Sequence, residues 1–498
     1  MKDDESAFAI LERSEAAAPD ADYLIDATRT WTYRELVNLS TRAAGALLEL
    51  GLRRGDRVLL ATRDRVEAVA TLWGAWRAGL VVVPVPPVWS AEELRSALAD
   101  SDARAVVADP GVATRIAPWV RSKIALLGLD GAGEISWQQA VRRAAPGPRA
   151  EASSGEVALW LYTSGSTGAP RALLHSHGGL VAASRGLLAA IGLGPGDRVL
   201  SVAKMFFAYG LGCSVHLPAA AGAAVVLHEG PSSAPAIVGC LERARPTVLC
   251  AVPSALRALL STPGAVLPPS VRAVLSAGEA LAPDLAAEFH ARFGLAPLDG
   301  FGCTEALHHV TCSRPGDLAP GSAGTALEGR QLSIRGDDGS ELAEGEPGAL
   351  WISTPSLAIA AREAGITAPL PTRGGWWPTG DIARLQGGRL FLLGRSDDMM
   401  KANGYRIFPG EIEAVIRQHP GVRDAAVVLR PVPAGAPELT AFVVLAGPLE
   451  DMDAVLGAHC AASLAPYKIP EVFVTTAELP RTITGKLRRA PLRGPTQP

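Results

Sequence analysis

Residues 163–171 read TSGSTGAPR and combine glycines, hydroxyl groups and one arginine in a single short segment. An apolar run of strand length, 157–161, precedes the segment, and Leu173 and Leu174 follow it, so it is held at both ends, unlike a flexible linker. A glycine-rich loop after a buried strand can point several backbone N–H groups at one phosphate. The side chains that would add donors or charge are those of Thr163, Ser164, Ser166, Thr167 and Arg171.

Two known phosphate-binding patterns do not fit this segment. A Walker-type loop requires two glycines with four residues between them, followed by lysine and then serine or threonine, and residues 165–171 lack that spacing. The three spaced glycines of a dinucleotide-binding turn are also missing. If this segment binds phosphate, it therefore does so by another scheme.

Composition limits the classes of protein. A chain of 498 residues with 48% apolar and 19% charged residues predicts a globular protein of two to four domains. The net charge of −3 gives no electrostatic reason to expect nucleic acid or an anionic membrane as partner, and no apolar run approaches the roughly 20 residues of a membrane span. An acidic N-terminus and six scattered cysteines predict a soluble protein in the reducing cytoplasm.

Short apolar runs alternate with amphipathic stretches through most of the chain. Strands are predicted at 58–60, 81–83, 105–107, 198–200, 224–227, 247–249 and 271–275, with helical spacing between them. Such alternation predicts parallel sheets covered by helices on both faces, with ligands beyond the carboxyl ends of the strands. We therefore expect chemistry in the loops after Leu161, Leu275 and Leu298.

The pattern changes near residue 345, where short strands separated by turns begin. After residue 398 a compact unit is predicted, with helices at 409–418 and 451–464 and strands at 424–429, 440–446 and 472–474. We predict a large domain at 1–395, with a β-rich, barrel-like subdomain at about 320–393, and a small α+β domain at 396–498. The overall class is α/β.

Five segments in order resemble the signature motifs of the adenylate-forming superfamily, which includes acyl- and aryl-CoA ligases, adenylation domains and luciferases. They are 163–171, SAGEAL (276–281), DGFGCTEALHH (299–309), WWPTGD (376–381) with GRSDDMMKANGYR (394–406), and PRTITGK (480–486). The resemblance covers about residues 20 to 490. MFFAYGLG (205–212) together with 299–309 is most similar to benzoate-CoA ligases and related aryl-CoA ligases. Two departures are Arg171, where lysine is usual, and Pro378.

The resemblance implies an enzyme that joins a carboxylate to the α-phosphate of ATP and then passes the acyl group to a thiol. Thr163, Ser164, Ser166, Thr167 and Arg171 would hold the β- and γ-phosphates, with Gly165 and Gly168 in the same loop. Thr304 would contact the α-phosphate, and Glu305, with Thr167, would hold Mg²⁺. The remaining nucleotide contacts would come from Gly278, Glu279, Asp299, Gly300, Phe301 stacked on adenine, Gly302, and Asp381 with Arg395 at the ribose.

Lys486 is the residue that the resemblance implies at the reacting bond. A cation there would offset the repulsion between substrate carboxylate and phosphate. Lys486 belongs to the small domain and the phosphate loop to the large one, so the site requires domain closure. The resemblance further implies a mobile small domain that turns about Asp397 and brings Lys401, Gly404 and Tyr405 to the thiol.

The acid is expected to be benzoate or an amino- or hydroxy-substituted benzoate. Ala208 stands where amino-acid-activating relatives have aspartate, and an unpaired ammonium would be costly to bury. The residues expected to line the pocket are Ala208, Tyr209, Ala277, Gly278, Gly302 and His308.

Several alternatives stay open. The acceptor thiol is expected to be CoA, with the phosphopantetheine of an acyl or peptidyl carrier protein as the alternative. His308 and Phe301 also fit ordinary core positions, and Glu305, Asp381 and Lys486 taken singly fit surface or turn positions. A non-catalytic binding protein and a hydrolase using Ser176 or His177 are the other classes, although no nucleophile elbow is present. A monomer or a homodimer is expected.

Overall fold

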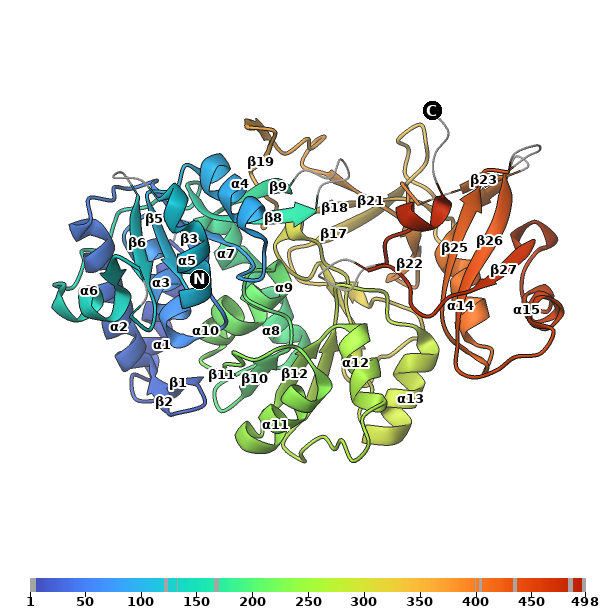
Figure 1. The fold of residues 1–498 in the computed structure, drawn as a ribbon, viewed down its shortest axis with the longest axis horizontal. Helices are drawn as coiled ribbons and strands as arrows, with labels where there is room; N and C mark the ends of the chain where they lie inside the picture. The colour runs from blue at the N-terminus through green and yellow to red at the C-terminus, as the bar shows by residue number, and fades with distance from the viewer. Residues whose placement is uncertain are drawn as a thin grey trace.

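The structure of the protein is a computed structural model that describes residues 6–120, 124–131, 133–164, 170–398, 400–402, 405–432, 437–481 and 487–494. Figure 1 shows three bodies along its long axis. Blue and cyan elements lie at one end, green and yellow elements in the middle, and the orange and red C-terminal unit at the other end.

A nine-stranded sheet forms the first body, and its central strands are parallel. Its order is β20(Ile366–Pro369)-β19(Ala360–Glu363)-β9(Pro170–Ser176)-β8(Val157–Ser164)-β4(Val81–Pro84)-β3(Arg57–Ala61)-β5(Ala105–Ala108)-β6(Ala125–Gly128)-β7(Ile135–Ser136). The pairs from β8 to β20 are antiparallel. All residues of β4 and β5 are buried, as expected for parallel strands covered on both faces.

A seven-stranded sheet forms the second body and is parallel except at the β1/β2 pair. Its order is β14(Leu298–Asp299)-β13(Ala273–Ser276)-β12(Val248–Ala251)-β10(Arg198–Ser201)-β11(Ala224–Val226)-β1(Asp22–Ile25)-β2(Thr30–Thr32). Helices α11(Ala234–Ala244), α12(Pro253–Leu260) and α13(Pro283–Phe293) pack on one face through an apolar cluster that includes Leu241, Leu256 and Phe289.

The largest apolar core contains residues of both sheets, for example Val82 and Leu159 of the first and Val225 of the second. Helices α1(Phe8–Ala17), α2(Tyr33–Glu49) and α3(Val66–Arg77) contribute to this core. The other face of the first sheet packs against α4(Ala91–Ser101) and α5(Pro110–Ile116). The remaining helices of this part are α6(Trp137–Arg143), α7(His177–Ala183), α8(Gly186–Ile191), α9(Ala208–Leu211), the π-helix Gly212–His216 and α10(Leu217–Ala221).

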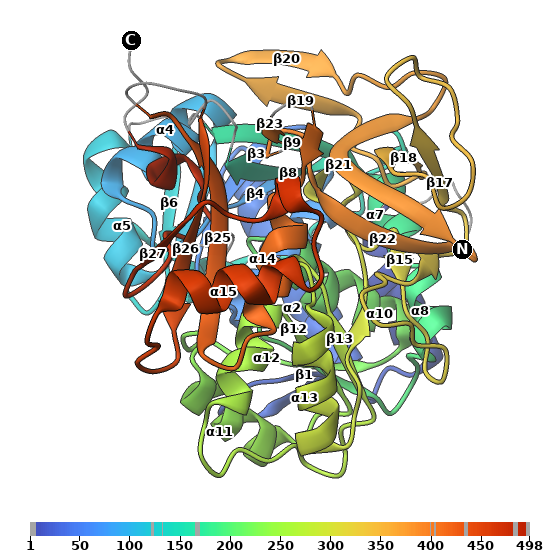
Figure 2. The same cartoon turned by 90° about the vertical axis from the view of Figure 1, so that its right-hand side faces the viewer.

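A six-stranded antiparallel sheet follows, in the order β15(Thr311–Cys312)-β16(Thr325–Ala326)-β22(Arg389–Arg395)-β21(Trp377–Gln386)-β18(Gly348–Ser353)-β17(Gln331–Arg335). One face buries Ile334, Leu350 and Leu390. Figure 2 shows β22 beside helix α14(Pro409–Arg417) of the C-terminal unit, and residues of the two elements are in contact. The sheet ends at Arg395, next to the predicted domain boundary.

The C-terminal unit has its own core around Ile412, Val427 and Leu456. Strands β25(Val422–Arg430), β26(Glu438–Leu445) and β27(Val472–Thr475) form a sheet, and helices α14(Pro409–Arg417) and α15(Met452–Ala461) pack against it. A two-stranded ribbon, β23(Met400–Ala402) and β24(Tyr405–Ile407), leads into the unit.

The predicted α/β class, with parallel-rich sheets between helices, a further β-rich sheet and a separate α+β C-terminal unit, is confirmed. The predicted strands in both parallel sheets agree with the structure to within a few residues. The exact domain limits at 395/396 and at 320–393 stay predictions. In the described part of the chain, no helix is long and apolar enough to cross a membrane.

Candidate active site

The two described ends of the TSGSTGAPR segment lie on paired strands of a β-hairpin. Strand β8 continues through Thr163 to Ser164 and pairs with β9, with Thr163 opposite Arg171. The sequence predicts a loop from Thr163 onward, but pairing with β9 extends the strand by three residues beyond the apolar run. Thr163 Oγ1 donates to the Arg171 carbonyl oxygen at 3.3 Å. Gly165, Ser166, Thr167 and Gly168 lie outside the described residues, as does the side chain of Ser164.

Arg171 faces Glu305, the predicted metal ligand, although the two residues are 134 positions apart. Arg171 Nη1 lies 3.3 Å from Glu305 Oε1, and both side chains are largely buried. Glu305 is in a 3₁₀ turn, Thr304–Ala306, whose base is closed by a β-bridge between Gly302 and His309. The structure therefore brings together two residues that the sequence assigned to the same phosphate-and-metal site.

Hydrogen bonds hold this turn, and the residue that follows it has a strained backbone. Leu307 follows it with φ of +67°, a region that bulky residues rarely adopt and that is common at functional sites. Ala358 N donates to the Glu305 carbonyl at 2.7 Å, and Ser356 Oγ donates to the Ala306 carbonyl at 2.8 Å. The backbone of the turn is thus held by two hydrogen bonds from the segment 356–358.

The donor groups at this turn fit Mg²⁺ bound mainly through a nucleotide. A carboxylate oxygen is a ligand that Mg²⁺ prefers, and Mg²⁺ is commonly held by one or two carboxylates together with substrate phosphates. Among the described residues, no group of three or more His, Cys, Asp or Glu side chains could hold a metal ion alone. Glu305 therefore suits a metal that arrives with its phosphates.

Asp381 and Arg395 lie opposite each other on β21 and β22. Arg395 Nη1 donates to the Thr379 carbonyl at 2.8 Å and lies 3.3 Å from Asp381 Oδ1. The Thr-Gly turn expected before Asp381 is an irregularity inside a ten-residue strand, with Gly380 at φ of +75°. A Cβ at Gly380 would come within 2.8 Å of Arg395 Nη2, so glycine allows this close approach. Asp397, the predicted hinge, is 73% exposed and lies 3.6 Å from Arg395 Nη2.

The residues predicted around adenine lie at the carboxyl ends of β13 and β14, as expected for open parallel sheets. Burial raises the pKa of Asp299 well above its ordinary value. Glu279 accepts bonds from Ser254 N at 3.1 Å and Ser254 Oγ at 2.9 Å, beside the first turn of α12. Phe301 is buried in the core of the six-stranded sheet, which also fits an ordinary core residue. Its stacking on adenine therefore stays a prediction. The roles of Gly278, Gly300 and Gly302 also stay predictions.

Tyr209 and His308, two of the predicted pocket residues, are close neighbours. Their ring centroids are 5.7 Å apart, and Tyr209 Oη donates to the Leu275 carbonyl at 3.2 Å, two residues before Ala277. Ala208 precedes Tyr209 in α9. His308 Nε2 lies 3.6 Å from Cys213 Sγ, so the ring has protein partners of its own.

Sequence reasoning missed three residues that support this wall: His309, Cys213 and Arg330. Arg330 is buried, and its Nε donates to the His309 carbonyl at 2.9 Å. Two adjacent histidines in 299–309 were the available signal for His309. Cys213 and Arg330 carried no local signal, because only tertiary contacts bring them to the site.

The predicted residues of the C-terminal unit are described only in part. Lys486 and Gly404 lie outside the described residues, and Lys401 and Tyr405 are described in their backbone only, in β23 and β24. The segment that contains Lys486 is flanked by a β-bridge between Arg481 and Leu487.

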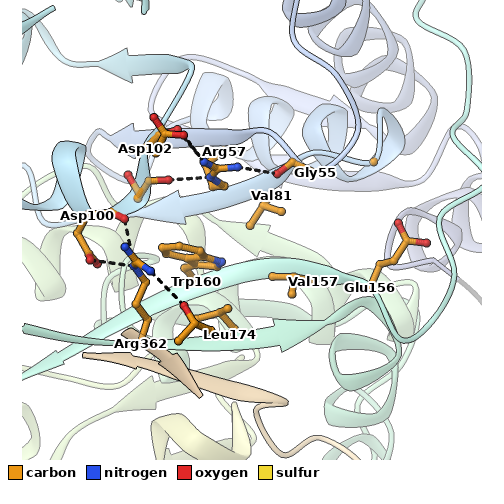
Figure 3. A pocket seen from close by; sticks show the side chains of 13 residues that line it. Gly55, Arg57, Val81, Asp100, Asp102, Glu156, Val157, Trp160, Leu174 and Arg362 are labelled. Carbon is orange, nitrogen blue, oxygen red and sulfur yellow. Dashed lines mark hydrogen bonds and ion pairs between the residues drawn. The ribbon is translucent and has the colours of Figure 1, made fainter. Parts of the chain in front are cut away.

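A separate cavity of about 440 Å³ lies at the opposite, amino-terminal ends of β3, β4 and β8. Figure 3 shows Trp160 between two arginine–aspartate pairs, Arg57 with Asp102 and Arg362 with Asp100. None of the predicted site residues that the structure describes lines this cavity.

Known proteins resemble this chain over nearly its whole length. The family described as "AMP-binding enzyme" matches residues 11–359, and "AMP-binding enzyme C-terminal domain" matches residues 411–486. A benzoate–CoA ligase of Thauera aromatica is 35% identical over 485 residues, 94% of this chain and 92% of that protein.

Two solved structures are similar in fold. An anthranilate CoA ligase in complex with anthranoyl-AMP has a TM-score of 0.92 at 29% identity, covering 99% of this chain and 97% of that one. A benzoate CoA ligase from Burkholderia xenovorans LB400 has a TM-score of 0.89 at 32% identity, covering 98% of this chain and 100% of that one. With its ordered motifs, its fold and these matches, the chain belongs to the AMP-binding enzyme family.

Proposed function

We propose that the protein activates an aromatic carboxylic acid with ATP and transfers it to the thiol of CoA, releasing AMP and pyrophosphate. The acid is benzoate or an amino- or hydroxy-substituted benzoate. Relatives named benzoate–CoA ligase and anthranilate CoA ligase support this substrate class. The observation that carries the proposal is the meeting of Arg171 and Glu305 at the tip of the β8–β9 hairpin.

The first half-reaction joins two anions, so charge neutralisation is its main requirement. Arg171 and the 163–168 segment bind the β- and γ-phosphates, and Thr304 contacts the α-phosphate. Glu305 and Thr167 hold Mg²⁺, which supplies positive charge to the phosphates when bound. Asp381 accepts hydrogen bonds from the ribose hydroxyls, and Arg395 Nη1, 3.3 Å from Asp381 Oδ1, holds that carboxylate in place. Lys486 places a cation between the attacking carboxylate and the α-phosphate.

The acid pocket is uncharged in this proposal. Burial is the main cause that holds the pKa of His308 well below its ordinary value, so this imidazole is neutral at physiological pH. Ala208 offers no carboxylate for a substrate ammonium, which would be costly to bury unpaired. A flat acid without a fixed positive charge fits the wall formed by Tyr209 and His308.

The second half-reaction needs a thiol. Lys401, Gly404 and Tyr405 are the residues proposed to approach the pantetheine arm after the unit 396–498 turns about Asp397. Free CoA and a carrier protein's phosphopantetheine have the same reactive end, and CoA is favoured because relatives of this length are CoA ligases. The carrier protein remains the alternative acceptor.

Acid-dependent exchange between ATP and pyrophosphate, measured with a panel of aromatic and aliphatic acids, tests the first step. We expect exchange with benzoates and little with α-amino acids. Adding CoA or a carrier protein then identifies the acceptor, and exchange without aryl-CoA would favour carrier loading. ATP-independent ester hydrolysis would point to a hydrolase instead.

Lys486→Ala tests the mechanism. We expect acyl-AMP formation to fall by about 100-fold or more, which corresponds to about 3 kcal/mol of lost stabilisation of the transition state. Arg488→Ala is the matched control, since it removes an exposed cation two residues away. Full-rate acyl-AMP formation in Lys486→Ala would refute the proposed mechanism.

A further inference from the structure

Two buried imidazoles are in direct contact beside Tyr209. His308 Nδ1 and His309 Nδ1 are 3.0 Å apart, and the residues are 3% and 2% exposed. Two glycines make room for the rings. A Cβ at Gly212 would come within 2.0 Å of the His308 ring, and a Cβ at Gly300 within 2.4 Å of the His309 ring. The pair is therefore built into the fold.

The contact determines how the protons are arranged. At 3.0 Å one Nδ1 must carry a hydrogen and the other a lone pair, because two lone pairs or two N–H groups would repel each other. His309 Nε2 is buried and has no hydrogen-bond partner among the described residues. A buried N–H without an acceptor is rarely tolerated, so this nitrogen is the bare one. His309 then donates from Nδ1, and His308 carries its hydrogen on Nε2.

The surroundings of His308 agree with this assignment. Its Nε2 faces Cys213 Sγ at 3.6 Å, and thiol sulfur accepts hydrogen bonds weakly. The backbone carbonyl of Tyr209 raises the pKa of His308, against the larger lowering by burial, and a carbonyl can only accept a hydrogen bond. The contact with Cys213 suits an N–H group at Nε2, and the carbonyl suits an N–H group on the ring.

The pair also bears on Tyr209. The His309 ring lies edge-on to the tyrosine ring at 5.4 Å, and the His308 ring is tilted against it at 5.7 Å. Tyr209 Oη is tied to the Leu275 carbonyl. The Tyr209 hydroxyl is thus held by the sheet, and the side of its ring is held by two imidazoles. These contacts fix the orientation of the ring that lines the pocket.

We propose that His309 is a positioning residue that fixes His308 as the Nε2–H tautomer and, through it, holds Tyr209 as the wall that selects the aromatic acid. This proposal rests on the proposed function for the pocket. His309 acts through its neighbours and need not touch the substrate.

A tautomer measurement tests the pairing without requiring activity. In protein labelled with ¹⁵N-histidine, the protonated and bare imidazole nitrogens have well-separated shifts, and His309→Phe assigns the pair. We expect one Nδ1–H and one Nε2–H ring, both neutral from about pH 5.5 to 8. Two Nε2–H rings, or a ring that titrates in this range, would overturn the assignment.

Kinetics test the positioning role. His309→Phe keeps a ring of similar size but removes the donor, and we expect the KM for the acid to rise by about tenfold while the KM for ATP stays within about twofold. His309→Asn restores an N–H group and should recover much of the loss. His290→Asn changes an exposed histidine and is the control.

The outcomes are distinguishable. An unchanged acid KM in a stably folded His309→Phe would overturn the proposal. Equal rises in both KM values with a lower melting temperature would show a merely structural role and would also overturn it. If wild-type protein activates no aromatic acid, the proposed function fails, while the tautomer result still stands or falls by itself.

Discussion

Two kinds of arginine–carboxylate pair occur in this protein. At the candidate site, Arg171 lies 3.3 Å from Glu305, and Arg395 lies 3.3 Å from Asp381. At the opposite end of the seven-stranded sheet, Arg272 grips both oxygens of Asp197 at 2.9 and 2.6 Å. Asp197 also accepts bonds from Thr247 Oγ1 and Gly194 N.

The difference in geometry suggests a difference in role. Short, two-pronged bonds between guanidinium and carboxylate are the strong form of this interaction, and they suit a joint between strands. The longer contacts at the site bring opposite charges together at less than full bond strength. In the proposed function, these charges regroup around phosphates and a metal ion when a nucleotide binds.

Glu305→Gln should have the largest effect, and this effect should be on activity. Removing the carboxylate charge removes a proposed Mg²⁺ ligand, so we expect pyrophosphate exchange to fall by about 100-fold or more. The melting temperature should change little, since the pair with Arg171 is long. Glu288→Gln, an exposed change on α13, is the control. A large loss of stability with normal exchange would reverse the assignment of roles.

Asp197→Asn should lower stability and leave activity unchanged, the opposite of Glu305→Gln. Burial raises the pKa of Asp197, but the bonds from Arg272, Thr247 and Gly194 outweigh it and leave the pKa lowered, so the ionised form is stabilised. We expect a loss of about 1–3 kcal/mol in the free energy of unfolding. Thermal denaturation measures it, and exchange activity per folded molecule should stay unchanged. A normal melting temperature would show that short bonds do not mark structural pairs here.

Buried histidines provide a test through pH. Burial is the main cause that lowers the pKa of His177 to about 4, whereas the unfolded chain takes up this proton below about pH 6.5. Since the unfolded state binds more protons, stability is lost as the pH falls from about 6.5 toward 4. The contribution is about 1.4 kcal/mol per pH unit for each such histidine.

His177→Gln should therefore flatten the dependence of unfolding free energy on pH by about that slope. Chemical denaturation at several pH values measures it. His290→Gln is the control, because His290 is exposed. An unchanged slope in His177→Gln would mean that His177 is not kept neutral by the fold.

The sequence predicted those features that depend on neighbours along the chain. Parallel strands such as β4 and β5 were recognisable because each is a short apolar run with helical spacing beside it. The extension of β8 to Ser164 was not, because it depends on pairing with β9 across the hairpin. The irregularity at Gly380 inside β21 was not predictable either, because the Thr-Gly pair resembles a turn and only pairing with the neighbouring strands shows that the strand continues through it.

The residues of the candidate site also fall into two groups, those that their own segment predicts and those that only tertiary contacts bring in. Arg171 and Glu305 were named from their segments, and the structure adds their contact. His309 and Arg330 gain their importance from burial and from partners far along the chain, which a single sequence does not contain. Ordered motifs therefore point to the residues predicted to meet the nucleotide, but not to His309 and Arg330, which lie behind the predicted acid pocket.

Asp100→Asn is expected to have the smallest effect on activity, because Asp100 contacts Tyr162 and not the predicted site residues themselves. Its Oδ2 accepts from Tyr162 Oη at 2.9 Å, and its Oδ1 accepts from Arg362 Nε at 2.9 Å (Figure 3 shows the contact with Arg362). Tyr162 directly precedes Thr163, so this contact holds the end of β8 at which the candidate site lies.

An asparagine keeps the shape of Asp100 but loses the charge and one acceptor. A double-mutant cycle with Tyr162→Phe, read from unfolding free energies, should give a coupling of about 0.5–1.5 kcal/mol. The KM for ATP should rise by no more than about threefold, since the hairpin is displaced but keeps its groups. Asp102→Asn, two residues away and paired with Arg57, is the control and should leave the KM for ATP unchanged. A coupling near zero would mean that Tyr162 is held by packing against Trp89 alone, and that even short bonds to Asp100 do not stabilise the hairpin.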